Sequence, residues 1–258
     1  MAITYFGSAS TPADGGSQAG PTVAVAPPAS MQVGDLVVMV SQQRVDAAGA
    51  PMNVLATGGQ TWNTLGQIED DAAHIAFRVF WCLFDGTWTA NPSVSVGSVT
   101  LPLSVVMHVF RPTSTDMLWA IDVAQAQAAF DAPELETESV LLDSRTTAHA
   151  STVTLGFWTT ADARAWLSMS GSGWSAFTPA QYENKLANYQ TSTYGRNIRT
   201  TVGVIDQVGQ RQQSPLAGGR WGMVTWYEEA PSAGQPITRR RGGVPGTVPG
   251  GQLIGRGW

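Results

Sequence analysis

Apolar and polar residues alternate with a period of two in several segments of the chain, which is the spacing of β-strands. Between His74 and Phe84 every odd position is apolar, while the even positions begin polar and end apolar. This pattern predicts a strand that runs from solvent into a core covering both of its faces. Similar segments predict roughly ten strands, of which we place Leu36–Ser41, His74–Phe84, Val105–Arg111, Leu118–Gln127, Thr152–Thr159, Ala165–Met169, Ile198–Val208 and Trp221–Glu228.

Helical periodicity is scarce in this chain. The best candidate is Thr178-Pro179, a cap and a first-turn proline ahead of Tyr182 and Leu186, which are spaced four apart. An extended conformation explains the same segment equally well. Short apolar segments separated by Gly, Pro, Asn and Asp predict an all-β protein whose sheets pack face to face.

The chain also reads as two diverged halves. Each half has an apolar strand, then a tryptophan that follows glycine, then a long strand, and finally a strand with a polar rim. The matching segments are Leu36–Ser41 with Val153–Trp158, Trp62 with Trp174, and Val105–Arg111 with Gly222–Glu228. Because the spacing is loose, a true repeat and a chance similarity stay equally open. A repeat predicts a two-sheet sandwich in which each half supplies strands to both sheets.

Composition narrows the class of protein. Charged residues make up 13% and hydrophobic residues 43%, so the low charge and ordinary apolar content favour a folded chain over a disordered one. No apolar run is long enough for a transmembrane helix, and Met1–Tyr5 lacks the features of a secretory signal. The single cysteine, Cys82, excludes an intrachain disulfide, and its apolar surroundings predict a buried, inert thiol.

Charge is divided unevenly along the chain. Residues 1–230 carry a net charge of −9, whereas residues 231–258 carry +4 together with 8 Gly and 4 Pro. Such a segment cannot bury a core of its own. We therefore predict three parts: an N-terminal strand and Gly/Pro-rich lead-in over residues 1–30, a β-sandwich body over 31–230, and an extended Gly/Pro/Arg-rich C-terminal arm over 231–258.

Candidate catalytic and metal-binding groups are sparse. The three histidines are scattered, and no nucleophile elbow, phosphate loop or metal-binding histidine motif occurs. We expect no catalytic residues, no cofactor and no metal site. The acidic run Glu69-Asp70-Asp71 fits a solvated turn better than a calcium loop. Three further glutamates occupy every second position: Glu134, Glu136 and Glu138. In an extended strand they would share one solvent-facing side. Alternatively, they form an acidic strip that receives a basic arm from a neighbouring subunit.

Tryptophan is unusually frequent, with 10 in 258 residues. Trp81 and Trp158 lie in apolar strands and are predicted to be core residues. Four others lie at predicted strand ends or turns: Trp62, Trp88, Trp119 and Trp174. These four could cap the core, form a subunit interface, where tryptophan is enriched, or stack on sugar rings.

The arm provides the second set of candidates. Arg239-Arg240-Arg241 could bind nucleic-acid phosphates, but the net −9 of the body opposes this, and we expect no nucleic-acid partner. Apolar residues near the end of the arm suggest docking on another protein. The candidate assembly contacts are Arg239, Arg240, Arg241, Leu253, Ile254, Arg256 and Trp258.

The order of several segments carries a family resemblance. The chain carries the following segments in this order: Gly34-Asp35-Leu36-Val37-Val38, Trp62, Arg78-Val79, Val109-Phe110-Arg111, Ala120-Ile121-Asp122-Val123, Leu155-Gly156-Phe157, Ser172-Gly173-Trp174 and Gly222–Tyr227. This order resembles the jelly-roll-like β-sandwich of minor tail and other virion proteins of tailed bacteriophages, of the type found in actinobacterial phages. The resemblance covers about residues 30–230, and it implies no catalytic residues. The acidic run at Glu69 and the arm depart from the family pattern.

The resemblance implies a non-enzymatic structural protein of a tailed-phage virion, with a minor tail or tail-tip protein as the favoured placement. Its partners would be other phage structural proteins and further copies of itself, without membrane insertion, after synthesis in the host cytoplasm. Two alternatives stay open: a carbohydrate-binding receptor module at the tail end that contacts a host glycan, and a capsid decoration or head fibre protein. A glycoside hydrolase, which would need two carboxylates across a cleft, is the least favoured.

Overall fold

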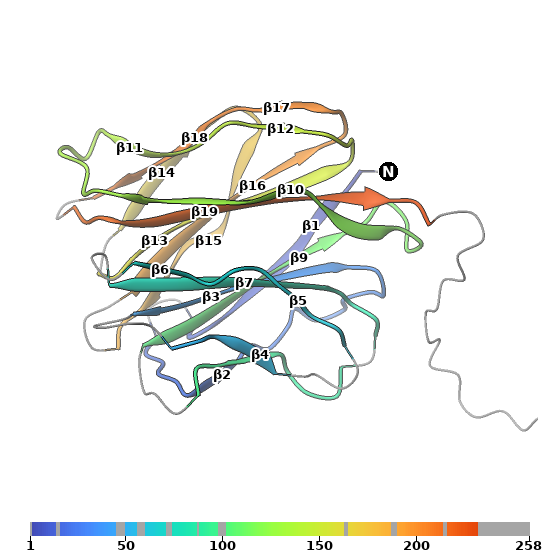
Figure 1. Ribbon diagram of the computed structural model, residues 1–258, viewed down its shortest axis with the longest axis horizontal. Coiled ribbons are helices and arrows are strands. Elements are labelled where there is room, and N and C mark those ends of the chain that lie inside the picture. The colour runs from blue at the N-terminus through green and yellow to red at the C-terminus, as the bar shows by residue number, and fades with distance from the viewer. Residues whose placement is uncertain are drawn as a thin grey trace, which may run out of the picture.

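The computed structural model describes residues 2–13, 16–44, 50–55, 60–70, 74–86, 88–97, 102–162, 165–186, 190–213 and 216–231. Over these residues the chain forms nineteen β-strands and no helix (Figure 1). The prediction of an all-β protein is therefore confirmed. It also follows that these residues contain no helix able to cross a membrane. The predicted arm and its seven candidate contacts all lie outside the described residues, apart from Pro231.

Two large antiparallel sheets form the centre of the molecule. The first takes its strands from the N-terminal half, in the spatial order β1 (Thr4–Thr11), β9 (Leu103–Arg111), β3 (Leu36–Arg44), β7 (Ile75–Leu83) and β5 (Asn63–Thr64), with β6 (Ile68–Asp70) also paired to β7. The second takes its strands from the C-terminal half, in the order β10 (Leu118–Phe130), β19 (Gly219–Glu229), β13 (Thr152–Thr160), β16 (Gln190–Arg199) and β15 (Trp174–Asn184).

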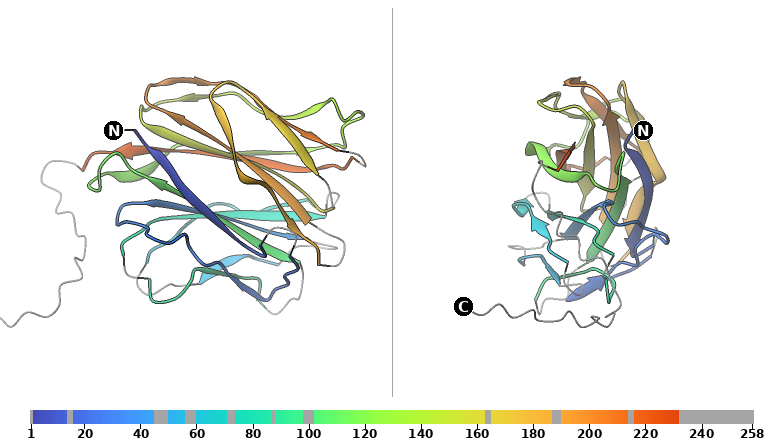
Figure 2. Two further views of the ribbon diagram at one scale, coloured as in Figure 1. Left: turned by 180° about the vertical axis from the view of Figure 1, so that it is seen from behind. Right: turned by 90° about the vertical axis from the view of Figure 1, so that its right-hand side faces the viewer.

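Smaller sheets cover the outer side of each large sheet. In the N-terminal half this cover is β2 (Thr22–Ala24), β8 (Ser93–Ser95) and β4 (Asn53–Leu55). In the C-terminal half it is β11 (Ser139–Leu142), β18 (Val208–Gln212) and β14 (Trp166–Ser170), beside the two-stranded ladder of β12 (Arg145–Thr147) and β17 (Gly203–Ile205). Figure 2 shows these sheets stacked as successive layers.

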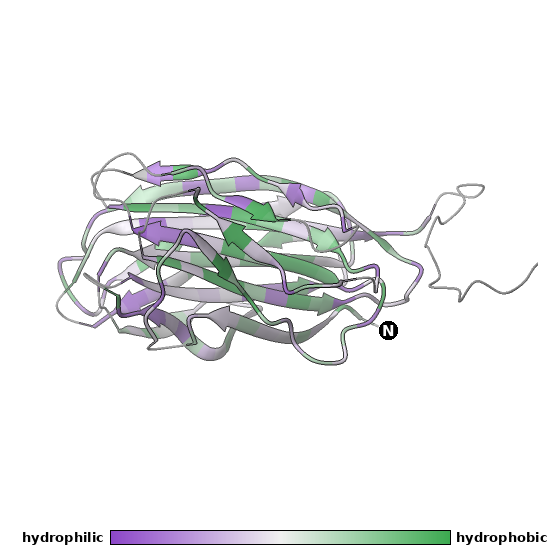
Figure 3. Cartoon of the chain, turned by 90° about the horizontal axis from the view of Figure 1, so that it is seen from below, coloured by the Kyte–Doolittle hydropathy of each residue, from purple (hydrophilic) through white to green (hydrophobic). Residues whose placement is uncertain are grey.

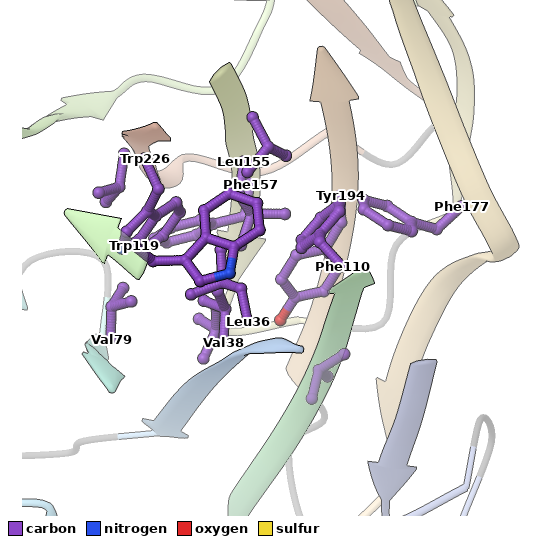
Figure 4. Packing of buried hydrophobic residues seen from close by; sticks show 14 of the residues in the cluster. Leu36, Val38, Val79, Phe110, Trp119, Leu155, Phe157, Phe177, Tyr194 and Trp226 are labelled. Atoms are coloured by element: carbon purple, nitrogen blue, oxygen red, sulfur yellow. The ribbon is translucent and has the colours of Figure 1, made fainter. Parts of the chain in front are cut away.

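Three hydrophobic clusters fill the spaces between the layers. The central cluster lies between the two large sheets and contains residues of both halves, such as Leu36 and Phe110 from the first and Phe157 and Trp226 from the second (Figure 4). The other two clusters lie between each large sheet and its small sheet. This layering explains why β3 and β13 are buried on both faces. Hydrophobic and hydrophilic positions follow one another along the strands (Figure 3), and alternate residues point to opposite layers.

Both halves arrange their strands in the same order. With the additional strands β6, β12 and β17 set aside, each half has eight strands. In the large sheet the first strand pairs with the eighth, the eighth with the third, the third with the sixth, and the sixth with the fifth. In the small sheet the second pairs with the seventh and the seventh with the fourth. The repeat hypothesis thus gains support, whereas the expectation that each half supplies both large sheets was wrong.

Residue positions in the two halves can be matched through strand register. Leu36 pairs with Phe110 across β3 and β9, and Val153 pairs with Trp226 across β13 and β19. The first strand of each half then meets the same partner: Tyr5 pairs with Phe110, and Ile121 pairs with Trp226. In both halves the register shifts immediately after that pair, which is the signature of a β-bulge. The two bulges therefore occupy equivalent places.

The β7 prediction is confirmed in detail. Phe77 and Val79 pack in the central cluster with Trp81 and Leu83 against it, while Phe80 and Cys82 pack in the outer one. Cys82 is buried, and burial raises the pKa of its thiol, as expected of an inert cysteine. Trp158 is also fully buried, as predicted.

One local prediction was wrong, and a second segment settles an alternative that the sequence had left open. Ile198–Val208 is not one strand, because β16 ends at Arg199 and the chain turns before β17 and β18. The valines of this segment are exposed at Val202 and Val204, so their alternation did not mark a buried face. The segment from Thr178 to Asn184 is extended in β15 rather than helical. There Tyr182 packs in the central cluster, which explains its apolar character without a helix.

Candidate functional site

Aromatic side chains gather at one end of the N-terminal half, near the end of β7 and the start of β3. The rings of Trp62 and Trp88 are stacked, with centroids 5.9 Å apart and planes 24° apart. Phe84 and Trp88 form a T-shaped pair, with centroids 4.9 Å apart and planes 73° apart. All three are partly buried and pack against the outer cluster of this half. We call Trp62, Trp88 and Phe84 the aromatic platform.

A glutamine holds the platform in place. The indole N–H of Trp88 donates to Oε1 of Gln60 at 2.9 Å. The Nε2 of Gln60 donates in turn to the carbonyl oxygen of Leu83 at 2.6 Å, at the end of β7. The backbone N–H of Asp85 also donates to Gln60 Oε1, at 3.3 Å. The polar edge of Trp88 is thus tied to the end of a core strand.

An open cavity of about 360 Å³ lies beside the platform. Its lining includes Pro27, Pro28, Met31, Phe84, Trp88 and Asn91. Sequence patterns identified Trp62 and Trp88 but not their association. Nothing in the spacing links Gln60 or Asn91 to them, because the association depends on β5 and β7 being neighbours, as the pairing of Asn63 with Trp81 shows.

The other two candidate tryptophans belong to the core. Trp119 packs in the central cluster, and its indole N–H donates to the carbonyl oxygen of Gly34 at 3.1 Å. Trp174 packs in the outer cluster of the C-terminal half and donates to the carbonyl oxygen of Asp206 at 3.1 Å. Both rings are nearly inaccessible, so of the four candidates only Trp62 and Trp88 can meet a ligand.

A second cavity, of about 400 Å³, lies beside residues 112–117, the segment that joins the two halves. Asp35 and Arg111 form its polar wall through a bidentate ion pair, with both N–O distances 3.1 Å. Asp35 is fully buried and also accepts the backbone N–H of Gln32 at 2.7 Å. The Arg111 guanidinium lies 4.0 Å from the centre of the Phe6 ring. The ion pair thus fixes the end of β9 to the start of β3.

Other titratable groups also make structural contacts. Glu228 accepts the backbone N–H and the hydroxyl of Thr113, and burial raises the pKa of its carboxyl against these hydrogen bonds. Asp122 accepts the backbone N–H of His149 at 3.0 Å and contacts Nδ1 of the same residue. The His149 ring stacks on Tyr227, with centroids 3.7 Å apart.

His108 is buried between the two large sheets. Its ring lies 4.1 Å from that of Phe177 and 4.7 Å from that of Tyr194, measured between centroids. Burial, and secondly the positive charge of Arg196, lowers its pKa from 6.5 to about 3. His108 is therefore neutral near pH 7, and neither ring nitrogen has a hydrogen-bond partner within the described parts of the chain.

The acidic candidates do not converge on a metal site in the part of the chain that can be described, where no three His, Cys, Asp or Glu residues could hold an ion. Glu69 and Asp70 lie in β6 and pair with β7, so the expected solvated turn was wrong for these two residues. Glu69 accepts a hydrogen bond from Nε2 of Gln67, and Asp71 lies outside the described residues. Glu134, Glu136 and Glu138 lie in an exposed turn and not in a strand. The prediction of a shared strand face was wrong, because Glu138 folds back to accept the backbone N–H of Glu134 at 2.8 Å.

Comparison of the chain with models of known families, with curated proteins and with solved structures finds no match.

Proposed function

We propose that the chain is a non-enzymatic structural protein of a tailed-phage virion, placed in the tail as a minor tail or tail-tip protein. The observation that carries the proposal is the duplicated strand order. Taken in chain order, the strands of each half resemble an eight-stranded jelly roll, in which the first, eighth, third and sixth strands face the second, seventh, fourth and fifth. The departure is that β5 and β15 pair with the large sheet. Jelly rolls are common in viral structural proteins.

The chemistry of the titratable groups supports a structural role. The carboxylates of Asp35, Glu228 and Asp122 are engaged by Arg111, Thr113 and His149, respectively. The first contact holds the start of β3 to the end of β9, the second ties the segment between the halves to β19, and the third ties the loop between β12 and β13 to β10. A rigid body of this kind is suited to occupying a fixed site through protein–protein contact.

The test of this proposal is the location of the chain in purified particles of the phage that encodes it. We expect mass spectrometry to detect the chain in the particles and immunogold labelling to place it at the tail or tail tip. Labelling of the capsid would replace the tail placement with the decoration or head-fibre alternative. Synthesis of the chain during infection without incorporation into particles would refute a structural role.

Assembly through the arm can be tested separately. Residues 231–258 carry four arginines and no acid, and the described strands end at Glu229. We expect deletion of residues 231–258 to prevent incorporation into particles or self-association, while the unfolding midpoint of the body stays unchanged. Replacing Arg239, Arg240 and Arg241 with serine gives a charge-only variant of equal length. A truncated chain that assembles with unchanged affinity would show that the arm has no role in assembly.

The carbohydrate-binding module remains the second candidate function. The specific observation in its favour is the aromatic platform beside an open cavity, described above.

A further inference from the structure

We propose that the cavity beside Trp88 binds a neutral sugar ring, with the face of the Trp88 indole as its stacking surface. This inference rests on the second candidate function, the carbohydrate-binding module, and assigns its site. It does not depend on where the chain lies in a particle.

The platform is built before a ligand arrives. Trp88 is held by stacking with Trp62, by a T-shaped contact with Phe84, and by the hydrogen bond from its indole N–H to Gln60. A ring that is already ordered costs less conformational entropy on binding than a free side chain. Because the indole N–H is already satisfied, the Trp88 side chain offers a ligand its π-face and not a hydrogen-bond donor.

The lining of the cavity defines the chemistry of the ligand. Its described lining residues carry no charged side chain, so an ionic ligand would lose hydration there without gaining a counter-charge. The face of an indole is electronegative and attracts the slightly positive C–H groups of an apolar ring face. Pro27, Pro28 and Met31 extend this apolar surface, while Ser30 and Asn91 provide a hydroxyl and an amide.

A pyranose combines the two properties that such a lining recognises. One face of the ring carries C–H groups, and its rim carries hydroxyl groups that both donate and accept hydrogen bonds. The cavity volume of about 360 Å³ falls at the small end of the ligand-pocket range of roughly 300–1,000 Å³. A proline-rich peptide, which also docks on aromatic grooves, would leave the amide of Asn91 and the hydroxyl of Ser30 largely unused.

The experiment titrates the full-length chain with methyl β-D-glucopyranoside, methyl β-D-galactopyranoside and methyl α-D-mannopyranoside. Saturation-transfer difference NMR and tryptophan fluorescence report binding. We expect at least one probe to bind saturably, with the strongest transfer to the C–H groups of one ring face. Trp88→Leu should weaken that binding about tenfold, the upper end of what an aromatic contact contributes. Asn91→Ala should weaken it by a smaller factor.

The controls separate loss of the site from loss of the fold. Phe130→Leu removes a partly buried aromatic ring that contacts Trp166 in the other half, and it should leave sugar binding unchanged. If Trp88→Leu proves unstable, Asn91→Ala still decides the matter, because Asn91 is exposed. The proposal is overturned if none of the three glycosides binds, if binding survives both substitutions, or if a proline-rich peptide binds at this cavity and the sugars do not.

Particle location and sugar binding can fail independently. A chain found in the tail that binds none of the sugars would keep the structural proposal and refute this one. Sugar binding by a chain absent from particles would do the reverse.

Discussion

The two halves of the molecule share their strand order and their bulges but differ in the chemistry at equivalent positions. Register matches Asp35 with Thr152 and Arg111 with Tyr227, since each lies next to a matched pair of core residues. The N-terminal half joins the start of β3 to β9 here with a partly buried ion pair. The C-terminal half places a threonine opposite a tyrosine. The fold thus depends on strand pairing and apolar alternation, while the polar contacts at the strand ends can be replaced.

The face shared by the halves shows a second difference. His108 in β9 matches Val224 in β19, because each lies two residues before the matched core aromatic. Both side chains are fully buried in the same central layer. Gln42 and Thr159 also occupy matched positions, and the Thr159 hydroxyl donates to Gln42 Oε1. Equivalent residues therefore meet across the layer, as in a pair of like subunits.

Removing a central aromatic should have the largest effect. Trp226→Ala and the matched Phe110→Ala each leave a large void in the shared cluster, and each should lower the free energy of unfolding by roughly 3–5 kcal/mol. Trp226→Phe should cost much less, because the Trp226 N–H has no acceptor among the described residues. Urea unfolding followed by circular dichroism measures all three variants.

The same experiment tests whether the halves are coupled. Because the central cluster contains residues of both halves, wild type and both alanine variants should unfold in one transition. Two transitions, with each substitution shifting only one of them, would show that the halves fold independently.

The ion pair should have the next largest effect. Asp35→Thr introduces the residue of the C-terminal half and leaves the Arg111 guanidinium without its carboxylate. Arg111 retains a side-chain exposure of 27%, so we expect a loss of about 2–3 kcal/mol, below the roughly 3–5 kcal/mol of a fully buried pair. The double variant Asp35→Thr/Arg111→Tyr should recover about 1 kcal/mol of this loss. A double-mutant cycle measured by urea unfolding tests this. If the double variant recovers no stability, the threonine and tyrosine of the C-terminal half cannot replace the ion pair at this place.

His108 should make stability depend on pH in a way that Val224 cannot. Its pKa is lowered from 6.5 to about 3 in the folded chain, so the unfolded chain binds the proton more tightly. Its stabilising contribution is complete above pH 6.5 and declines as the pH falls toward 3. Between pH 7 and pH 5 the loss should be about 2 kcal/mol, because it accrues at 1.36 kcal/mol for each pH unit below 6.5.

His108→Val isolates this contribution from other titrating groups. The charged or ionisable groups around His108 are Arg196, Tyr182 and Tyr194, and of these none changes charge between pH 5 and pH 7 in its usual state. As the pH falls from 7 to 5, the unfolding free energy of wild type should therefore decrease by about 2 kcal/mol relative to that of His108→Val. A constant difference would contradict the assignment.

Sequence patterns predicted the long strands that are covered on both faces, but they missed most of β16, left β15 open between a helix and an extended segment, and revealed few of the short strands. Strands β3, β7, β9, β13 and β19 carry continuous or alternating apolar residues because both faces are covered. Strands such as β2, β4 and β8 have only three residues each, too few for a period to be visible. The aromatic platform was half visible in Trp62 and Trp88. Its glutamine and its cavity depend on loops brought together by pairing between distant strands, which no local pattern encodes.

The smallest predicted effect concerns a turn residue that lies just before β3 in the N-terminal half and just before β13 in the C-terminal half. Gly34 and Ser151 are matched by register, and both have positive φ, 99° and 51° respectively. Glycine adopts this region without steric cost, whereas an L-residue loses roughly 1–2 kcal/mol there. Ser151→Gly should therefore stabilise the chain, by about 0.5–1 kcal/mol after allowing for the greater freedom of glycine in the unfolded chain.

Two further variants serve as controls. Ser151→Ala keeps the Cβ and should give no gain. Gly34→Ala should destabilise, since its Cβ would lie 3.1 Å from the Thr115 carbonyl oxygen. Urea midpoints that rank Ser151→Gly below wild type would show that the serine side chain stabilises this turn by more than its backbone strain costs.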